Sequence, residues 1–197
     1  MKVTACLLSY KRRENMGKIV THLLQQSFID EILVKNNLYG DNNISFGRYE
    51  MANKASNDIV YFQDDDCLNL DIGKLHSSFI KKQDRITHAV IEGYEEETKK
   101  NTYGKAQMCM VGWGAFFKKD WIKYFDPYLS KYGADEVFYR EADRIVSILM
   151  NRHHNAVPCN IAQMPIADDV KISLCAEEEH LWFKKESVKR ALELCQK

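Results

Sequence analysis

Three adjacent carboxylates, Asp64, Asp65 and Asp66, follow the apolar residues 59–62, with only Gln63 between them. A short apolar run of this kind predicts a buried strand, so the carboxylates would lie where that strand ends. Ligands of open α/β sheets bind outside the carboxyl ends of the strands. Adjacent carboxylates repel one another, and Mg²⁺ or Mn²⁺, which prefer oxygen ligands, would offset that repulsion. The triplet therefore predicts a divalent-cation site at a sheet edge, with a solvated acidic loop as the alternative.

Other motifs that hold phosphate or perform catalysis are absent from the sequence. No Asp follows the triplet at the spacing of a prenyl-synthase motif, and the Gly-Lys pairs at 17, 73 and 104 lack the remaining residues of a phosphate loop. No Gly-x-Gly-x-x-Gly follows the first apolar run, and no Gly-x-Ser-x-Gly occurs. These absences argue against dinucleotide binding and against serine hydrolase chemistry.

The elements that would position the triplet follow an alternating pattern over the first 90 residues. Apolar periodicity predicts strands at residues 3–9, 29–35 and 59–62, and helices at residues 14–26, 46–56 and 71–82. The residues between 36 and 45 are rich in Asn, Asp and Gly, which is typical of a loop. Alternating strands and helices predict a parallel sheet with helices on both faces.

The second half of the chain is less regular. The pattern predicts a polar loop at 92–107, a short helix at 121–124, a helix at 134–149, one or two short strands within 158–165 and a terminal helix at 184–195.

Composition places the chain among single-domain globular proteins. It has 197 residues, 45% of them apolar, and 28 Lys plus Arg balance 28 Asp plus Glu. The zero net charge argues against a general nucleic-acid binder. No apolar stretch approaches the ~20 residues of a spanning helix, and no signal peptide is evident, so we expect a cytoplasmic protein. Six cysteines without a Cys-x-x-Cys pair suit a reducing compartment.

The residues around the triplet resemble the donor-binding half of GT-A glycosyltransferases. That family often has an Arg sixteen residues before an Asp-x-Asp motif and a small residue seven after the Arg; here Arg48 precedes Asp64 by sixteen, and Ala55 is the small residue. Asn57-Asp58 stands where the family has Gly-Glu, and Tyr49 and Met51 replace its usual Asn and Gly.

Three further segments agree in order and spacing with this resemblance. Residues 4–12 are similar to the first strand and nucleoside loop, residues 112–117 to the strand beside the donor sugar and acceptor, and residues 141–145 to the acidic helix start. The Asp-Asp-Asp and Gly-Ala-Phe-Phe strings are also similar to exostosin-like transferases. The resemblance implies one Rossmann-like α/β domain over residues 1–197. Within it, residues 1–90 would bind the nucleotide sugar, 91–165 would hold the acceptor and catalytic groups, and 166–197 would form a lid and terminal helix.

The resemblance also implies roles for individual residues. The side chains expected at the donor are Ser9, Tyr10, Arg12, Asn36, Arg48, Asp64, Asp65 and Trp113. Among these, Ser9, Tyr10 and Arg12 would line the nucleoside pocket, and Tyr10 could stack on the base. Asn36 could reach the base or ribose, and Arg48 the diphosphate. Trp113 could pack on a sugar face or lie in the core.

The same resemblance assigns the metal and the chemistry. Asp66 would contact the metal directly, and Asp64 would hold the ribose or the metal's water shell. A late His would be a third ligand, with His153, His154 and His180 as candidates; His180 is the one expected, because it lies in a charged segment at 168–185 that suits a lid. Asp143 is the expected general base, with Glu141 as its rival.

The function expected from the sequence is therefore a metal-dependent glycosyltransferase. It would use Mn²⁺ or Mg²⁺ to move a sugar from a nucleoside-diphosphate sugar, with UDP the expected nucleotide, to a hydroxyl of a glycan or another acceptor. Two alternatives stay open. One is a nucleotidyltransferase on a related sheet, although no Gly follows the first strand until Gly17; the other is an inactive binding module with the same fold.

Overall fold

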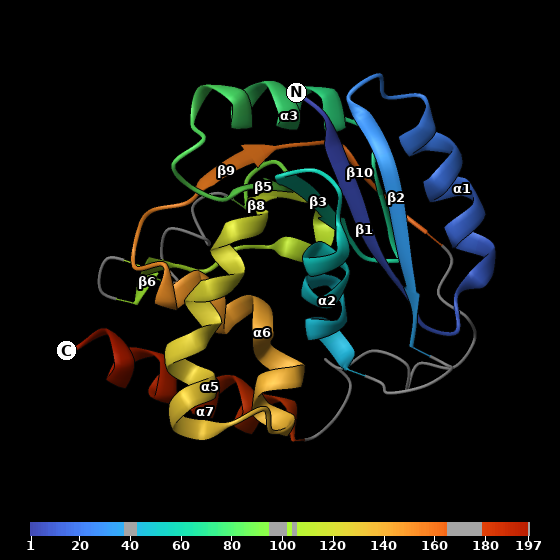
Figure 1. Cartoon of the computed structure of the whole chain (residues 1–197). Helices are drawn as coiled ribbons and strands as arrows, with labels where there is room; N and C mark the ends of the chain where they lie inside the picture. The colour runs from blue at the N-terminus through green and yellow to red at the C-terminus, as the bar shows by residue number, and fades with distance from the viewer. Residues whose placement is uncertain (38–42, 95–101, 104–105, 165–178, 197) are drawn as a thin grey trace.

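A six-stranded sheet forms the centre of the molecule in this computed structural model, with the strand order β2-β1-β3-β8-β5-β9 (Figure 1). The structure describes residues 1–37, 43–94, 102–103, 106–164 and 179–196. The strands are β1 (Val3–Ser9), β2 (Ile29–Asn36), β3 (Ile59–Gln63), β5 (Thr87–Val90), β8 (Ala115–Lys118) and β9 (Asn155–Pro158). β1 pairs in parallel with β2 and β3, and β5 with β9, whereas β8 runs antiparallel between β3 and β5.

The central strands are buried along their whole length because both of their faces are covered. Every residue of β1 and of β3 is buried, whereas the edge strand β2 is only half-buried. Continuous burial of this kind is expected of parallel strands between two helical layers. The helices are α1 (Arg13–Leu24), α2 (Gly47–Lys54), α3 (Ile72–Lys81), α5 (Asp126–Tyr132), α6 (Glu136–Leu149) and α7 (His180–Cys195).

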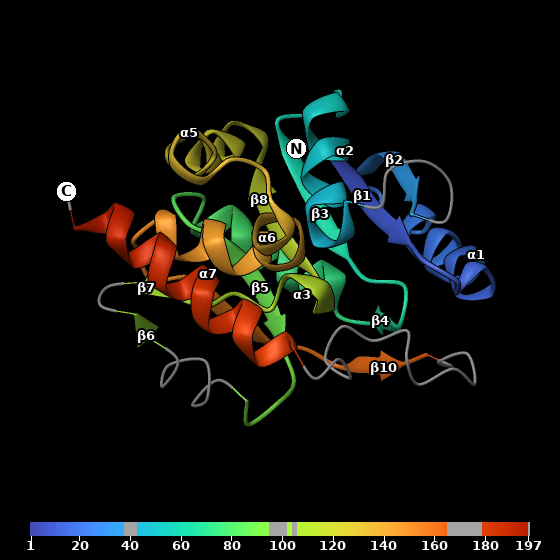
Figure 2. The same ribbon diagram turned by 90° about the horizontal axis from the view of Figure 1, so that it is seen from below.

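Aromatic contacts divide the core into two layers, because neighbouring strand residues face opposite ways. On one face, Phe116 of β8 packs against Phe79 of α3 and against Phe28, which stacks on His76. On the other face, Phe117 contacts Tyr49 of α2. α6 and α5 join α2 on this second side, and α7 packs along α6 at the outside (Figures 1 and 2).

Short elements complete the fold around the sheet. Strands β4 (Cys67–Asn69) and β10 (Ile161–Gln163) form an antiparallel pair, as do β6 (Thr102–Tyr103) and β7 (Ala106–Gln107). Three 3₁₀ helices, η1 (Ile44–Phe46), η2 (Val111–Trp113) and η3 (Lys119–Phe125), lie in the connections. None of the helices in the described ranges is long and apolar enough to cross a membrane.

The expected α/β architecture with a mostly parallel sheet is confirmed. The three predicted strands and three predicted helices of the first 90 residues all form, within two residues at most of their ends. The sequence pattern missed β4, β5 and α5, and it also missed β6 and β7, which lie within the stretch 92–107 that it predicted as a loop. Two corrections concern the second half: residues 155–158 form β9 ahead of the predicted stretch, and residues 180–183 are the first turn of α7 instead of loop. The segments predicted as loop at 95–101 and as lid at 166–178 lie outside the described residues.

Candidate active site at the carboxyl edge of the sheet

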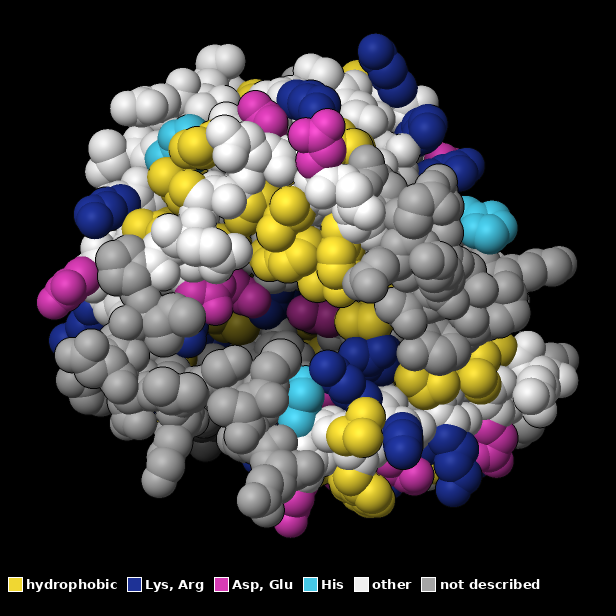
Figure 3. Space-filling view, turned by 180° about the vertical axis from the view of Figure 1, so that it is seen from behind, with side chains coloured by type: hydrophobic (Ala, Val, Ile, Leu, Met, Phe, Trp, Pro, Cys, Tyr) yellow, Lys and Arg dark blue, Asp and Glu magenta, His cyan; other side chains and the backbone are white. Residues whose placement is uncertain are grey.

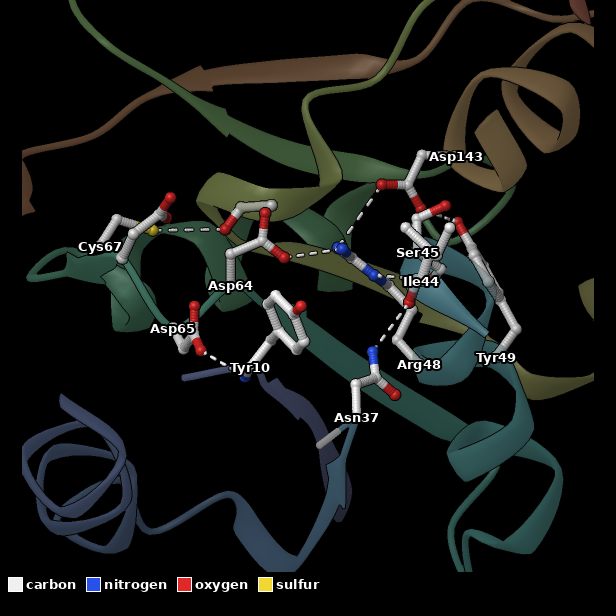
Figure 4. Close-up of polar contacts among 12 residues, drawn as sticks. Tyr10, Asn37, Ile44, Ser45, Arg48, Tyr49, Asp64, Asp65, Cys67 and Asp143 are labelled. Carbon is white, nitrogen blue, oxygen red and sulfur yellow. Dashed lines mark hydrogen bonds and ion pairs between the residues drawn. The ribbon is translucent and has the colours of Figure 1, made fainter. Parts of the chain in front are cut away.

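The ends of five elements meet at one edge of the sheet. The parallel strands β1, β2 and β3 all finish there, and β8 begins there because it runs the opposite way. The amide of Asp64, just after β3, donates to the carbonyl of Gly112 in η2, 2.8 Å away. Helix α6, which lies on the same side of the sheet as α2, brings Asp143 to this edge (Figure 4). This arrangement gathers most of the side chains that the sequence singles out.

The side chain of Asp65, the middle carboxylate, points into the interior of the protein. Its Oδ2 accepts the backbone N–H of Tyr10 at 2.7 Å, and its Oδ1 accepts Nη1 of Arg12 at 2.7 Å. Asn15 donates to its carbonyl oxygen. Burial raises the pKa of Asp65, although these donors act in the opposite direction. Asp65 and Arg12 therefore fix the loop after β1 to the loop after β3.

Asp64 and Asp66 remain open to solvent on either side of this buried residue. Their side chains are 38% and 37% exposed, against 6% for Asp65. Burial and the neighbouring charge of Asp64 raise the pKa of Asp66 to about 6, even with Nη1 of Arg12 at 3.6 Å. The two accessible carboxylates suit a hard divalent cation, because such an ion prefers oxygen ligands and would offset the repulsion between them.

The remaining ligands of such a cation would come from water or substrate. No group of three His, Cys, Asp or Glu side chains suited to a metal occurs in the part of the chain that the structure describes. Mg²⁺ in proteins commonly keeps several waters and shares substrate phosphates with one or two carboxylates.

Arg48 links the donor edge to α6. Its Nη2 donates to Oδ1 of Asp64 at 2.6 Å, and its Nη1 lies 3.5 Å from Oδ2 of Asp143 (Figure 4). The guanidinium is almost fully buried, with Nε donating to the carbonyl of Ser45. Burial alone would lower the pKa of Arg48, but Asp143 and Asp64 outweigh it and raise that pKa. The side chain is therefore a fixed cation between two carboxylates.

Asp143 is held on both oxygens and still reaches solvent. Its Oδ1 accepts the hydroxyl of Tyr49 at 2.7 Å, and its side chain is 22% exposed. Burial raises the pKa of Asp143, while Arg48 and Tyr49 oppose that change. A partly accessible carboxylate with a raised pKa beside a carboxylate pair is suited to take a proton from a substrate.

Glu141 and His180 form a separate cluster. Glu141 is buried, accepts Nε of Arg144 at 2.9 Å and lies 3.7 Å from Nδ1 of His180. Its backbone departs from helical geometry (φ −115°, ψ 23°), which interrupts α6 two residues before Asp143. Glu141 is thus engaged in packing α7 against α6. His180 lies in this cluster rather than with Asp64 and Asp66.

The end of β2 brings a residue that the sequence reasoning missed. Asn37, rather than Asn36, is buried at this edge, and its N–H donates to the carbonyl of Ser9. Its Nδ2 donates to the carbonyl of Ile44 at 3.3 Å, while Oδ1 has no hydrogen-bond partner among the described residues. Ile44 has a φ of +43°, a rare conformation for a β-branched residue.

One signal could have pointed to Asn37, because the first residue past a strand lies at the edge of the sheet just as its last residue does. No comparable signal points to Tyr49, because its bond to Asp143 depends on how α2 and α6 pack. Trp113, the remaining predicted residue, is half-buried in η2 directly after Gly112.

The face that carries this edge is hollowed, with acidic and basic side chains in its depth and hydrophobic ones at its rim (Figure 3). The mostly parallel central sheet flanked by helices matches the GT-A type of glycosyltransferase fold. Comparisons of the sequence with protein-family models and with curated proteins find no match.

Solved structures of glucosyl-3-phosphoglycerate synthase from Mycobacterium tuberculosis are similar to this chain. One, in complex with Mn²⁺, uridine-diphosphate-glucose and phosphoglyceric acid, has a TM-score of 0.57 at 10% identity, covering 99% of this chain and 80% of that chain. Another, with Mn²⁺, uridine-diphosphate and glucosyl-3-phosphoglycerate, has a TM-score of 0.54 at 9% identity, with the same coverage. At this identity the likeness establishes the fold, and the chemistry rests on the site.

Proposed function

We propose that this chain is a glycosyltransferase that takes its sugar from a nucleoside-diphosphate sugar, with UDP as the nucleotide. The observation that carries the proposal is the line of charges Asp66, Asp64, Arg48 and Asp143 along one sheet edge. Asp66, Asp64 and Arg48 would hold a cation and the diphosphate, and Asp143 would be the carboxylate that acts on the acceptor. The fold supports the same class, since the similar synthase holds Mn²⁺ and uridine-diphosphate-glucose.

The nucleoside would lie over the ends of β1 and β2. The ring of Tyr10 would stack on the base, and Oδ1 of Asn37 would accept an N–H from it. The orientation of the Asn37 amide is fixed because Nδ2 already donates to Ile44. An acceptor at this point favours uracil, whose N3 carries a hydrogen, over cytosine, whose N3 carries none. Arg12, which donates to Asp65, would shape this pocket by holding the loop of Tyr10.

Asp66 and Asp64 would hold Mn²⁺ or Mg²⁺. When bound there, the ion would neutralise the negative charge that develops on the diphosphate as it leaves. Arg48 would add a fixed positive charge on the other side of Asp64.

Asp143 would activate the acceptor. The bond between the anomeric carbon and the phosphate oxygen breaks, and UDP departs with that electron pair. The acceptor hydroxyl forms the new bond to the anomeric carbon, and its proton passes to a carboxylate oxygen of Asp143. Tyr49 and Arg48 would hold that carboxylate in place. Glu141 is excluded from this role in our proposal because its oxygens face Arg144 and His180.

Release of UDP from UDP-sugars in the presence of Mn²⁺ tests the proposal. We expect release by the wild type and, in Asp143→Asn, a fall in transfer of about 10²-fold or more with UDP affinity unchanged. A protein that binds UDP-sugar without turnover would be the binding module, and one that releases pyrophosphate from a nucleoside triphosphate would be the nucleotidyltransferase. Either result would overturn the proposed activity.

A further inference from the structure

Trp113 is held in place by a glycine on each side. A Cβ on Gly112 would lie 2.8 Å from Cγ of Asp64, and a Cβ on Gly114, whose φ is +117°, would lie 2.6 Å from the Tyr61 hydroxyl. Neither position has room for a side chain, so the backbone presses against the sheet edge on both sides of the tryptophan. The carbonyl of Trp113 also accepts Nδ2 of Asn69 at 3.4 Å. The indole is half-buried, one residue from the contact with Asp64.

A second aromatic ring completes a corner with this indole. Tyr94 follows β5 in a turn closed by its N–H to the carbonyl of Ile91 at 2.9 Å. Its ring meets Trp113 with the centroids 5.4 Å apart and the planes at 68°. Tyr94 is half-buried, like Trp113. The two rings therefore lie at a steep angle to each other at the edge of the site, and part of the surface of each is open to solvent.

The strand order shows which end of the substrate this corner faces. From β2 across β1 to β3, the sheet carries Asn37, Tyr10 and then the acidic triplet. β8 and β5 lie on the far side of β3, so Trp113 and Tyr94 stand beyond Asp64, away from the nucleoside end. A nucleotide sugar laid along this edge, with its diphosphate at the triplet, points its sugar and its reaction partner toward the two rings.

In the described part of the site, three arginines are engaged by carboxylates. The cations Arg12, Arg48 and Arg144 each donate to a carboxylate, namely Asp65, Asp64 and Glu141. A small phosphorylated acid would need such cations, whereas a sugar ring offers a face of C–H groups that loses apolar surface to water on stacking.

We propose that the corner formed by Trp113 and Tyr94 binds the acceptor and that this acceptor is a neutral saccharide. This inference rests on the proposed function and names the substrate class of the same site. The C–H face of the acceptor ring would stack on the exposed part of the corner and so direct one of its hydroxyls toward Asp143. A non-stacking anionic acceptor such as 3-phosphoglycerate would gain nothing from these rings.

The test compares acceptors and variants at a fixed concentration of UDP-sugar and Mn²⁺. The probes are methyl glycosides and β-linked and α-linked disaccharides of glucose, galactose, mannose and N-acetylglucosamine, with 3-phosphoglycerate and glycerol as comparators. UDP release above the rate of donor hydrolysis measures transfer. The variants are Trp113→Leu, Trp113→Phe and, as a matched control, Trp182→Leu, which removes an indole that is 54% exposed on α7.

We expect at least one saccharide to exceed 3-phosphoglycerate as acceptor by about tenfold in kcat/KM. Trp113→Leu should lose about tenfold in kcat/KM for that saccharide while UDP affinity stays within about twofold, and Trp113→Phe should recover part of the loss. Trp182→Leu should match the wild type. Normal UDP binding with transfer to 3-phosphoglycerate alone, to no saccharide, or equally well by Trp113→Leu would overturn this inference. Failure of the wild type to bind UDP or release it would instead contradict the proposed function, and the inference with it.

Discussion

Asp64, Asp65 and Asp66 are adjacent in the chain, but the structure holds each of them differently. Asp65 is buried and accepts from Tyr10 and Arg12, whereas Asp64 and Asp66 keep more than a third of their side chains exposed. One carboxylate therefore stabilises the fold of two loops, and the outer two remain for a ligand. Because Asp65 is buried and Asp64 is partly exposed, the same substitution should affect stability at position 65 and ligand binding at position 64.

Asp65→Asn should lower the free energy of unfolding by about 1.5–3 kcal/mol, because a buried charge-assisted hydrogen bond to Arg12 is weakened. Asp64→Asn should change stability by less than about 1 kcal/mol, since its side chain is 38% exposed, but should abolish metal-dependent UDP binding. Urea unfolding and calorimetric titration of UDP measure the two effects. A larger stability loss in Asp64→Asn than in Asp65→Asn would contradict these assignments.

For individual residues, the sequence predicted which side chains form the site better than it predicted their contacts with one another. The pattern of an apolar run followed by Asp residues located the triplet, and the family resemblance brought in Arg48 and Asp143. The bridge from Asp64 through Arg48 to Asp143 could not be predicted, because it depends on how α2 and α6 pack across the sheet. The choice of Asn37 over Asn36 depends in the same way on which residue the end of β2 turns inward.

At the scale of elements, the contact between η2 and the loop after β3 positions Asp64. Gly112 lies directly against that side chain, and its carbonyl accepts both the amide of Asp64 and the thiol of Cys67. A side chain at position 112 would have to displace the Asp64 carboxylate. A Cβ added to Gly17, in α1, would meet no atom within 4 Å, so that position offers a matched comparison.

Gly112→Ala should therefore weaken metal-dependent UDP binding by about tenfold or more, with a stability loss of about 1–3 kcal/mol, because Asp64 must turn away. Gly17→Ala should gain about 0.5–1 kcal/mol from the higher helix propensity of alanine and bind UDP normally. Thermal unfolding with and without UDP and Mn²⁺ gives both quantities. Normal UDP binding by Gly112→Ala would show that this contact does not position Asp64.

The elements that periodicity predicted are those with a continuous or strongly amphipathic apolar pattern, such as β1, β3 and α3. β5 was missed because Thr87 and His88 interrupt its apolar character, although both are buried in the sheet. The start of α7 was missed because the segment 168–185 as a whole is rich in charged residues. Packing against α6 and the contact of His180 with Glu141 make the start of α7 helical.

For the molecule as a whole, two histidines are buried, one in the sheet and one just before β9. His88 in β5 accepts the N–H of Met110 at 3.2 Å, and His154 contacts the carbonyl of Ser147 at 3.1 Å. Burial lowers the pKa of His88 to about 3 and that of His154 to about 4. Both are therefore neutral in the folded protein at neutral pH, and both would be protonated in the unfolded chain below its ordinary pKa of about 6.5.

Because the unfolded chain binds these protons first, stability should fall as pH drops from about 6.5 toward 4, by about 1.4 kcal/mol per pH unit for each histidine. Asp66, with its pKa raised to about 6, acts in the opposite direction over part of this range. Asp66 is present in every variant, so comparing variants removes its contribution. His154→Asn should make the stability depend less steeply on pH, whereas His153→Asn, at the exposed neighbouring residue, should leave that slope unchanged. Urea unfolding across this range measures the slope. Equal slopes in wild type and His154→Asn would contradict the prediction.

The overall architecture followed from the sequence because alternating strands and helices permit few arrangements. The position of β8, inserted antiparallel between β3 and β5, did not follow, since a strand of four residues carries no signal for its neighbours. That insertion brings Gly112 and Trp113 to Asp64, and with them the part of the site that we assign to the acceptor.

The central claim is that this sheet edge binds a uridine nucleotide through a cation held by Asp66 and Asp64. The most direct measurement is the thermal unfolding midpoint with UDP, GDP or CDP, each in Mn²⁺ or in EDTA, for the wild type and Asp66→Ala. UDP at about 100 times its Kd should add ~2.7 kcal/mol with Mn²⁺, with no gain in EDTA or in Asp66→Ala and little gain for CDP. No shift with any nucleotide, or a UDP shift independent of both metal and Asp66, would contradict the account.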